Sequence, residues 1–310
     1  MERLAYLVGF WPDYETSFFE QATYEMARVS VFNPLIATQN YPLVDKYPRP
    51  LRNRLYRRAV DKLVKENPDA IFILQENRFI LDLIPRLFRN RKAAVFNRNI
   101  VQSGTKNHHA LDLAQFLGVP IYSFDQDDCN KYGYRFCNQI ISKLDYFSND
   151  GVPEGDICFV GRNKGREPLL RQYQAALSEV GVTLDVVLVG ATKYDSISYI
   201  DYLALQLNAR CILDVGQADQ RGLTLRPLEA ACYGKKLISN NRFLAQEPFY
   251  DPQNILILEE EFDAKAVKHF LISPIHSVPN EVLRQYDPGC VIDHIIEDLG
   301  NVPALFHKSG

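Results

Sequence analysis

The sequence lacks a long hydrophobic run, because none of its segments approaches the roughly 18 apolar residues that cross a bilayer. Its N-terminal segment has neither a basic stretch nor a small-residue cleavage site, so it does not resemble a secretory signal. The formal net charge is only -3, so a global positive field that would attract nucleic acid is missing. These absences favour a cytoplasmic protein that neither spans a membrane nor binds nucleic acid.

The six cysteines also lack a recognisable pattern. None forms a C-x-x-C pair, and no histidine stands at zinc-ligand spacing from any of them. Cys158 and Cys211 lie within apolar, strand-like runs. Such placement is typical of buried free thiols in a reducing compartment, and it argues against a small disulfide scaffold.

What the sequence does contain is a regular alternation of apolar runs and helix-like segments. The runs that we expect to form strands are 4–10, 31–37, 70–74, 93–96, 119–124, 157–160, 184–189, 211–215, 236–239 and 255–258. Strands that alternate with helices favour parallel sheets built from βαβ units. The predicted fold class is therefore α/β.

A polar stretch with two glycines and a proline, residues 148–155, interrupts this alternation. We therefore expect an N-terminal domain over residues 1–148 and a C-terminal domain over 149–310, with the last helix a candidate to pack back on the N-terminal domain. Two Rossmann-like α/β/α domains would face a central cleft, with a ligand at the carboxyl ends of the strands.

A basic, glycine-containing loop follows the strand expected at 157–160 and precedes a helix. The loop, Gly161-Arg-Asn-Lys-Gly-Arg166, contains the cations Arg162, Lys164 and Arg166. Glycines let backbone N–H groups approach a ligand, and a helix N-terminus beside cations favours phosphate. A solvated turn is the alternative. The loop matches neither the P-loop nor the dinucleotide fingerprint.

A second segment, 217–230, follows the strand expected at 211–215 and opens the next helix. Gly222 permits a tight turn, and Thr224 is placed to cap the helix or to contact a phosphate. Arg226 and Glu229 are three residues apart and share a helical face, where they could serve a diphosphate and a ribose. A surface ion pair between the two is the alternative.

These two segments resemble the C-terminal domain of bacterial GT-B glycosyltransferases, in particular those of lipopolysaccharide and capsular-polysaccharide biosynthesis. The resemblance extends over roughly 120–258, and the first 118 residues share only the order of strands and helices. It implies a nucleotide-sugar donor held by the C-terminal domain. The predicted donor-binding residues are Gly161, Arg162, Lys164, Arg166, Gly222, Thr224, Arg226 and Glu229.

The same resemblance leaves the stereochemistry of transfer open. Many retaining members carry two glutamates eight positions apart in this region, whereas Arg221 stands eight positions before Glu229. The resemblance also implies that neither a metal nor another cofactor is needed beyond the nucleotide-sugar co-substrate. Asp125-Gln-Asp127 is the one Asp-x-Asp considered, and we expect it to cap a helix.

Transfer with inversion would need a side chain that deprotonates the acceptor hydroxyl. Asp13 follows the first expected strand and is the first candidate, with a solvated turn residue as the alternative. His108, beside His109, follows the fourth expected strand and is the second candidate. An exposed position at the start of a helix is the alternative for these histidines.

An arginine-rich segment at 46–58 contains Arg54, Arg57 and Arg58, which we expect on one helical face, away from Leu51 and Leu55. Such a face could dock on anionic lipids, because the acceptor of a surface-glycan enzyme can be lipid-linked. The alternative is a solvated helix face.

The leading hypothesis is a glycosyltransferase that transfers a sugar from a nucleotide-sugar donor to a glycan or glycolipid acceptor of the bacterial surface. It would be cytoplasmic, with peripheral contact at the inner face of the cytoplasmic membrane. A nucleotide-sugar epimerase on the same fold and a non-catalytic nucleotide-sugar-binding subunit are the alternatives. A NAD-dependent enzyme is disfavoured, because Val8-Gly-Phe-Trp-Pro12 replaces the glycine-rich turn.

Overall fold

The computed structural model describes residues 5–10, 13–22, 29–32, 48–144, 153–190, 197–216 and 221–301. The chain divides into two compact units: unit 1 comprises Met1–Gln139 with Pro288–Gly310, and unit 2 comprises Ile140–Asp287. Most of the expected break at 148–155 lies outside the described residues. Among the described helices, none is both long and apolar enough to cross a membrane.

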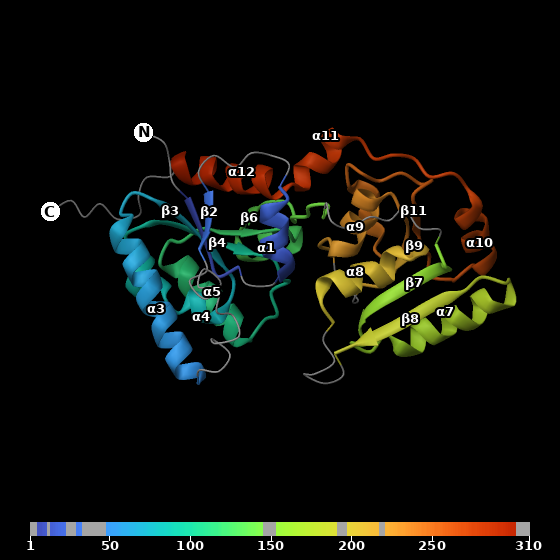
Figure 1. Cartoon of the computed structure of the whole chain (residues 1–310), viewed down its shortest axis with the longest axis horizontal. Helices are drawn as coiled ribbons and strands as arrows, with labels where there is room; N and C mark the ends of the chain where they lie inside the picture. The colour runs from blue at the N-terminus through green and yellow to red at the C-terminus, as the bar shows by residue number, and fades with distance from the viewer. Residues whose placement is uncertain are drawn as a thin grey trace. The chain divides into compact units, whose positions relative to one another are not determined.

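Unit 1 contains, among its described residues, a six-stranded parallel sheet of order β2-β1-β3-β4-β5-β6 (Figure 1). The strands are β1 (Ala5–Val8), β2 (Val29–Phe32), β3 (Ile71–Gln75), β4 (Lys92–Asn97), β5 (Ile121–Ser123) and β6 (Arg135–Phe136). The helices are α1 (Asp13–Glu20), α3 (Arg49–Glu66), α4 (Arg78–Leu81), the π-helix η1 (Ile84–Phe88), α5 (Lys106–Phe116), α6 (Gln126–Tyr132) and α12 (Pro288–Asn301).

Unit 2 contains, among its described residues, a five-stranded parallel sheet of order β11-β10-β9-β7-β8. The strands are β7 (Gly155–Arg162), β8 (Leu184–Val189), β9 (Ala209–Asp214), β10 (Lys236–Ser239) and β11 (Ile255–Ile257). The helices are α7 (Glu167–Glu179), α8 (Tyr199–Leu207), α9 (Leu225–Tyr233), the 3-10 helix η2 (Arg242–Gln246), α10 (Ala264–Ile272), α11 (Asn280–Leu283) and the 3-10 helix η3 (Arg284–Tyr286).

The two sheets share one topology. In each unit the first strand lies between the second and the third, as β2-β1-β3 and as β8-β7-β9. The strand order therefore reverses between β1 and β3 in unit 1 and between β7 and β9 in unit 2. In open parallel sheets, ligands bind outside the carboxyl ends of the strands at such switch points.

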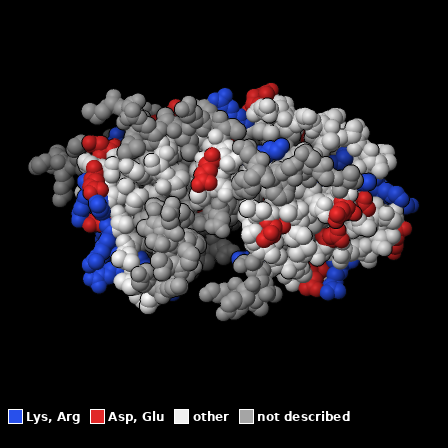
Figure 2. Space-filling model, in the orientation of Figure 1, with Lys and Arg blue, Asp and Glu red and all other residues white. Residues whose placement is uncertain are grey.

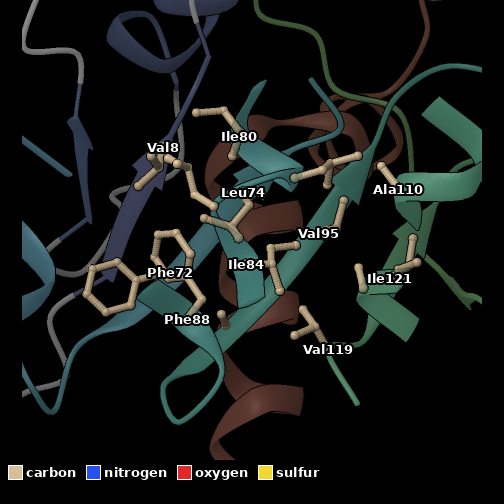
Figure 3. Packing of buried hydrophobic residues seen from close by; sticks show 14 of the residues in the cluster. Val8, Phe72, Leu74, Ile80, Ile84, Phe88, Val95, Ala110, Val119 and Ile121 are labelled. Carbon is tan, nitrogen blue, oxygen red and sulfur yellow. The ribbon is translucent and has the colours of Figure 1, made fainter. Parts of the chain in front are cut away.

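One hydrophobic cluster of unit 1 packs on one face of its sheet (Figure 3), and the strand residues that point to the other face, such as Leu7 and Ile73, are buried as well. Phe72 of β3 and Val95 of β4 point toward Ile84 and Phe88 of η1. The Phe72 and Phe88 rings meet edge to face, with centroids 5.4 Å apart. The segment between β3 and β4 thus forms two short helices, α4 and η1, and both close this face.

The chain returns to unit 1 through α12, which contacts α1 and β4. Asp298 of α12 accepts hydrogen bonds from the Tyr122 hydroxyl at 2.6 Å and from Nη1 of Arg135 at 2.7 Å. These bonds join α12 to β5 and β6. Asp125 caps α6 by accepting a hydrogen bond from Asp128 N at 2.9 Å, so its expected capping role is confirmed.

In unit 2 both faces of β7 are covered. Ile157 and Phe159 belong to the cluster that includes the apolar side chains of α7 and α10. Cys158 and Val160 point to the opposite face and pack with Tyr202 of α8. Alternate residues of a strand point to opposite faces, so the apolar run of β7 reflects burial on both sides.

Helix α3 buries a different face from the one that the sequence predicts. Leu51 and Leu55 are 39% and 43% exposed. Tyr56, Val60 and Leu63 form the buried stripe instead. The expectation that the arginines lie opposite a buried Leu51 and Leu55 is therefore wrong.

Candidate functional site

The cations of the basic loop at the end of β7 differ in how far they are exposed to solvent. Arg162 and Lys164 are exposed, whereas Arg166 is half-buried. Lys164 has a φ of 43° and Gly165 a φ of 80°, so the chain turns through the left-handed region here. Asn163 accepts a hydrogen bond from Glu167 N at 3.1 Å and thereby caps the start of α7. One backbone N–H at the start of α7 is thus satisfied within the unit, although the N-cap residue Arg166 makes no side-chain capping bond.

Arg226 of α9 joins the two strands at the unit 2 switch point. Its Nη2 donates to the carbonyl oxygen of Val160 in β7 at 2.6 Å. Its Nη1 lies 3.2 Å from Oδ1 of Asp214 at the end of β9. A Cβ placed on Gly161 would lie 2.5 Å from Nη2 of Arg226, so the glycine makes room for the guanidinium.

Asp214 organises this end of the sheet, although the sequence-based analysis did not single it out. The side chain is 1% exposed. It accepts hydrogen bonds from the Thr224 hydroxyl at 3.2 Å and the Ser239 hydroxyl at 3.1 Å, in addition to Arg226. The sequence feature that could have identified Asp214 is a carboxylate at the carboxyl end of a buried strand.

Two partly buried guanidinium groups at this position have buried hydrogen-bond donors that are unused among the described residues. Nη1 of Arg166 donates to the carbonyl oxygen of Val215. The guanidinium carbons of Arg166 and Arg226 lie 5.4 and 5.1 Å from the centre of the Phe159 ring. The Nε atoms of both arginines are buried, and no described residue offers them a hydrogen-bond acceptor. A bound anion would supply acceptors for such donors.

The N-terminus of α9 is the second source of positive potential. Thr224 occupies the N-cap position, but its side chain makes no capping hydrogen bond, and its hydroxyl donates to Asp214 instead. The first turn of α9 contains no acidic residue. The first backbone N–H groups of a helix without a side-chain cap attract anions. The expected capping role of Thr224 is therefore not what the structure shows.

The cations of this region crowd one another. Burial, followed by the charges of Arg166, Arg162 and Arg226, lowers the pKa of the Lys164 ammonium. Burial and the Arg226 guanidinium likewise lower the pKa of Arg166. We define the anion site as Arg162, Lys164, Arg166 and Arg226 together with the N-terminus of α9. Its geometry suits a ligand with several negative oxygens.

Glu229, predicted to hold a ribose, lies inside unit 2. Its side chain is fully buried and accepts hydrogen bonds from the Tyr199 hydroxyl at 2.9 Å and the Tyr202 hydroxyl at 3.0 Å. Nε2 of Gln206 donates a third hydrogen bond at 2.8 Å. Burial raises the pKa of this carboxyl. Glu229 therefore ties α9 to α8, and Gly222, also predicted to bind the donor, is buried just before α9.

The two proposed catalytic residues lie in unit 1. Asp13 is the first residue of α1, and its side chain lies outside the described residues, so its role stays a prediction. Nδ1 of His108 accepts a hydrogen bond from Gly104 N at 3.2 Å, and Nε2 lies 3.5 Å from Oδ1 of Asp112. A neutral ring with Nδ1 engaged in this way carries its proton on Nε2.

This tautomer affects whether His108 can act as a metal ligand or as a general base. His108, His109 and Asp112 could together surround a cation, since their ligand atoms lie within 4.8 Å of one another. However, neither nitrogen of His108 then has a free lone pair for a metal or for a proton. The geometry therefore weighs against a base or ligand role for His108 while the Gly104 hydrogen bond is intact.

Arginines line the exposed side of α3, and Lys and Arg side chains gather over this helix in Figure 2. Arg54, Arg57 and Arg58 are exposed, and Arg57 lies over the Phe79 ring at 5.4 Å. Lys62 and Lys65 differ from them, because each pairs with an acid one turn away. The N-terminal half of α3 thus presents arginines beside exposed leucines.

Comparisons with known proteins identify the fold. No family model and no curated protein matches the sequence. The structure is similar to UDP-GlcNAc 2-epimerase from Methanocaldococcus jannaschii, with a TM-score of 0.53, 9% identity, and coverage of 97% of this chain and 100% of that chain. It is also similar to sucrose-phosphate synthase from Thermosynechococcus elongatus, with a TM-score of 0.51, 12% identity, and coverage of 90% and 84%.

At such low identity these similarities concern the fold alone. Together with the two parallel sheets, they confirm the predicted α/β class with two Rossmann-like domains of the GT-B type. One similar protein is named as an epimerase and the other as a synthase. The fold is therefore compatible with more than one reaction.

Proposed function

We propose that the protein is a glycosyltransferase whose unit 2 binds the diphosphate of a nucleotide-sugar at the anion site. The observation that carries the proposal is the pair of buried, acceptor-free Nε atoms of Arg166 and Arg226 beside the uncapped start of α9. Both features lie at the β7/β9 switch point, where the topology favours a ligand. Exposed Arg162 and Lys164 extend the positive charge outward.

Each part of the site has a role in this proposal. Arg166 and Arg226 would donate to diphosphate oxygens, and Lys164 would stabilise the negative charge that develops on the leaving group. Asp214 holds Arg226 and Thr224 in position. Glu229 acts from inside the unit by tying α9 to α8, since its oxygens are engaged there.

Donor binding is tested by a thermal-shift screen of the full chain against nucleoside diphosphates and nucleotide-sugars. A ligand that binds only the folded protein stabilises it, by about 2.7 kcal/mol at one hundred times its Kd. We expect stabilisation by one nucleotide family and by its sugar conjugates. No response to any nucleotide would contradict the proposal.

A nucleotide-sugar epimerase is the alternative on the same fold. The structural similarity to such an enzyme concerns the fold alone, so it leaves this alternative open. Product analysis separates the two reactions. A transferase releases a nucleoside diphosphate, whereas an epimerase returns an isomeric sugar that is still attached to the nucleotide. Tight binding with neither product would favour the third alternative, a non-catalytic binding subunit.

The proposed acceptor is a bacterial surface glycan or glycolipid, as the sequence resemblance to lipopolysaccharide and capsule enzymes suggests. The arginines of α3 support contact with an anionic membrane, where a lipid-linked acceptor would be found. We propose a cytoplasmic protein that docks peripherally at the inner face of that membrane. We also propose transfer without a metal, so a chelator such as EDTA should leave activity unchanged.

A further inference from the structure

Unit 1 contains a polar cluster at its own switch point, of which Glu15, Gln75, Glu76 and Arg98 are buried and Asn99 is exposed. Glu15 comes from α1, Gln75 and Glu76 stand at the end of β3, and Arg98 and Asn99 follow β4. We call these five residues the unit 1 cluster. The carboxyl ends of parallel strands meet at one edge of a sheet, so the cluster lies where the topology favours a ligand.

Glu15 and Arg98 form the frame of this cluster. Nη1 of Arg98 donates to Oε1 of Glu15 at 2.6 Å, and the two side chains are 4% and 3% exposed. Nε2 of Gln75 donates to Oε2 of Glu15 at 3.0 Å. Nε of Arg98 donates to Oε1 of Gln139 at 2.9 Å. Both oxygens of Glu15 are therefore engaged, and the ion pair is held from two sides.

Glu76 differs from Glu15 in how its two carboxyl oxygens are satisfied by side chains. The residue is 5% exposed, and its Oε1 accepts a hydrogen bond from Nδ2 of Asn99. Its Oε2 is buried and has no hydrogen-bond partner among the residues that the structure describes. Nδ2 of Asn107 fixes the Glu76 backbone by donating to its carbonyl oxygen at 3.0 Å. A buried carboxylate oxygen without a donor is costly, and a ligand that supplies one would remove the penalty.

The charges of the cluster indicate what kind of ligand this is. Two carboxyl groups, Glu15 and Glu76, share one cation, Arg98, so the cluster has no positive charge left for an anion. An oxygen acceptor such as Oε2 requires a ligand with a hydrogen-bond donor. A neutral sugar hydroxyl meets both conditions, whereas a phosphate meets neither.

We propose that the unit 1 cluster binds the hydroxyl group of the acceptor and that Oε2 of Glu76 takes the hydroxyl proton. This inference rests on the proposed sugar transfer. The acceptor oxygen forms a bond to the anomeric carbon of the donor as the bond from that carbon to the diphosphate oxygen breaks. The electron pair of the broken bond leaves on the diphosphate, and the proton passes to Glu76. Direct displacement of this kind inverts the anomeric centre.

The surroundings of Glu76 suit proton transfer. Burial raises the pKa of its carboxyl. Hydrogen bonds from the backbone of Glu76 and Arg98, the Arg98 charge and the hydrogen bond from Asn99 oppose that rise. A base whose pKa is raised toward the working pH accepts a proton more readily than an ordinary glutamate. Glu15 is a positioning residue here, because its carboxylate contacts Arg98 and Gln75 and acts on Glu76 through them.

Water can replace the unidentified acceptor in the test. The nucleotide-sugar that stabilises the protein most is the donor, and release of nucleoside diphosphate by hydrolysis is measured. Glu76→Gln keeps the shape of the side chain and removes the base. We expect release to fall by about 10²–10⁴-fold, the range for a lost general base, with an unchanged donor-induced thermal shift.

A second measurement, the pH dependence of nucleoside diphosphate release, does not require Glu76→Gln to fold. In the wild-type protein, release should fall as the pH drops below the raised pKa of Glu76, at a pH above the 4.5 of an ordinary glutamate. Glu15→Gln removes the partner of Arg98, which can then turn toward Glu76 and lower its pKa. The acid limb should therefore move to lower pH in Glu15→Gln.

Several outcomes would overturn the inference. Normal release by Glu76→Gln, or a wild-type profile without an acid limb above pH 4.5, would exclude Glu76 as the base. Loss of release in Asp13→Asn with near-normal release in Glu76→Gln would assign the role to Asp13. A donor that binds but is never hydrolysed also counts against Glu76. Absence of any nucleotide-induced shift would remove the transferase proposal itself, and this inference with it.

Discussion

At the scale of single residues, the position of the Arg226 side chain explains why residue 161 is a glycine. A Cβ at this position would lie 2.5 Å from Nη2 of Arg226. We expect Gly161→Ala to displace the guanidinium from the Val160 carbonyl and from Asp214. Leaving these buried groups unpaired should lower the free energy of unfolding by about 1–3 kcal/mol, measured by urea denaturation.

Gly155→Ala, at the other end of β7, is the matched control. Its new Cβ would lie 2.8 Å from Oδ2 of Asp185, which is the free end of an exposed side chain and can move away. We expect a smaller loss of stability than in Gly161→Ala. Equal losses in the two variants would show that the contact with Arg226 is not the reason for the glycine.

Lys164 should make nucleotide binding sensitive to alkaline pH. Because burial and the neighbouring arginines lower its pKa, the ammonium loses its charge at a lower pH than an ordinary lysine. The affinity for a nucleoside diphosphate should therefore decline earlier as the pH rises. Lys164→Arg keeps its charge and should not show this decline. Identical pH profiles by calorimetry would contradict the role of Lys164 in the anion site.

Glu15 should make the stability of unit 1 decrease with rising pH. Burial raises its pKa to about 7 in the folded protein, and the Arg98 charge only partly opposes that rise. The folded state thus holds a proton that the unfolded state has already released, so stability falls between about pH 4.5 and pH 7. This contribution is present at low pH and is lost as the pH passes through the folded pKa.

Urea denaturation of the wild type and of Glu15→Gln across that window checks the prediction. The amide does not titrate, so the difference in unfolding free energy between the two proteins should change with pH. A constant difference from pH 4.5 to pH 7 would show that Glu15 is ionised throughout.

Residue spacing predicted the position of Arg226 and Glu229 on α9 but not their partners. Their spacing of three places them on one helical face, and the family resemblance implies donor-binding roles for both. The structure directs Arg226 to Asp214 and Glu229 to Tyr199 and Tyr202. Spacing fixes the angle of a side chain on its own helix, whereas the neighbouring element decides what it contacts. For the same reason the sequence did not reveal the unit 1 cluster.

At the scale of elements, α3 shows how a simple spacing rule can misplace a buried face. Residues four apart on an α-helix are offset by about 40°, so a row of such residues drifts around the helix. Leu51 and Leu63 are three such steps apart, and only Leu63 is buried. Tyr56, Val60 and Leu63, at intervals of four and three, keep to one side. The existence of the helix was predictable, but its orientation was not.

The exposed half of α3 should bind anionic membranes. Each arginine near an anionic surface contributes about 1 kcal/mol, so Arg54→Ala/Arg58→Ala should weaken binding to phosphatidylglycerol vesicles by roughly thirtyfold. Co-sedimentation at low and high salt measures this, because screening should weaken the wild-type interaction.

Lys62→Ala/Lys65→Ala removes the same charge from the same helix and serves as the control. Both lysines pair with acids one turn away, so this variant should bind the vesicles nearly as well as the wild type. Equal binding of phosphatidylcholine and phosphatidylglycerol vesicles by the wild type would reject the membrane-docking proposal.

At the scale of the whole molecule, the strand–helix alternation predicted two parallel sheets, and the structure contains them. The assignment of α12 to unit 1 depends on contacts that are distant in sequence, such as those of Asp298 with Tyr122 and Arg135. Local patterns contain no information about such pairs. The shared topology of the two sheets, and hence their switch points, likewise emerged only from strand pairing.

Calorimetric titration with the stabilising nucleoside diphosphate tests the central claim, that the anion site of unit 2 binds a diphosphate, most directly. We expect Arg162→Ala/Lys164→Ala to weaken binding by about tenfold or more, because charged hydrogen-bond donors are lost. Arg171→Ala/Lys268→Ala removes equal charge elsewhere in unit 2, where Arg171 pairs with Glu167 and Lys268 donates to Val180 O, and should bind normally. Equal affinity in both double variants, or no nucleotide binding by the wild type, would contradict the account.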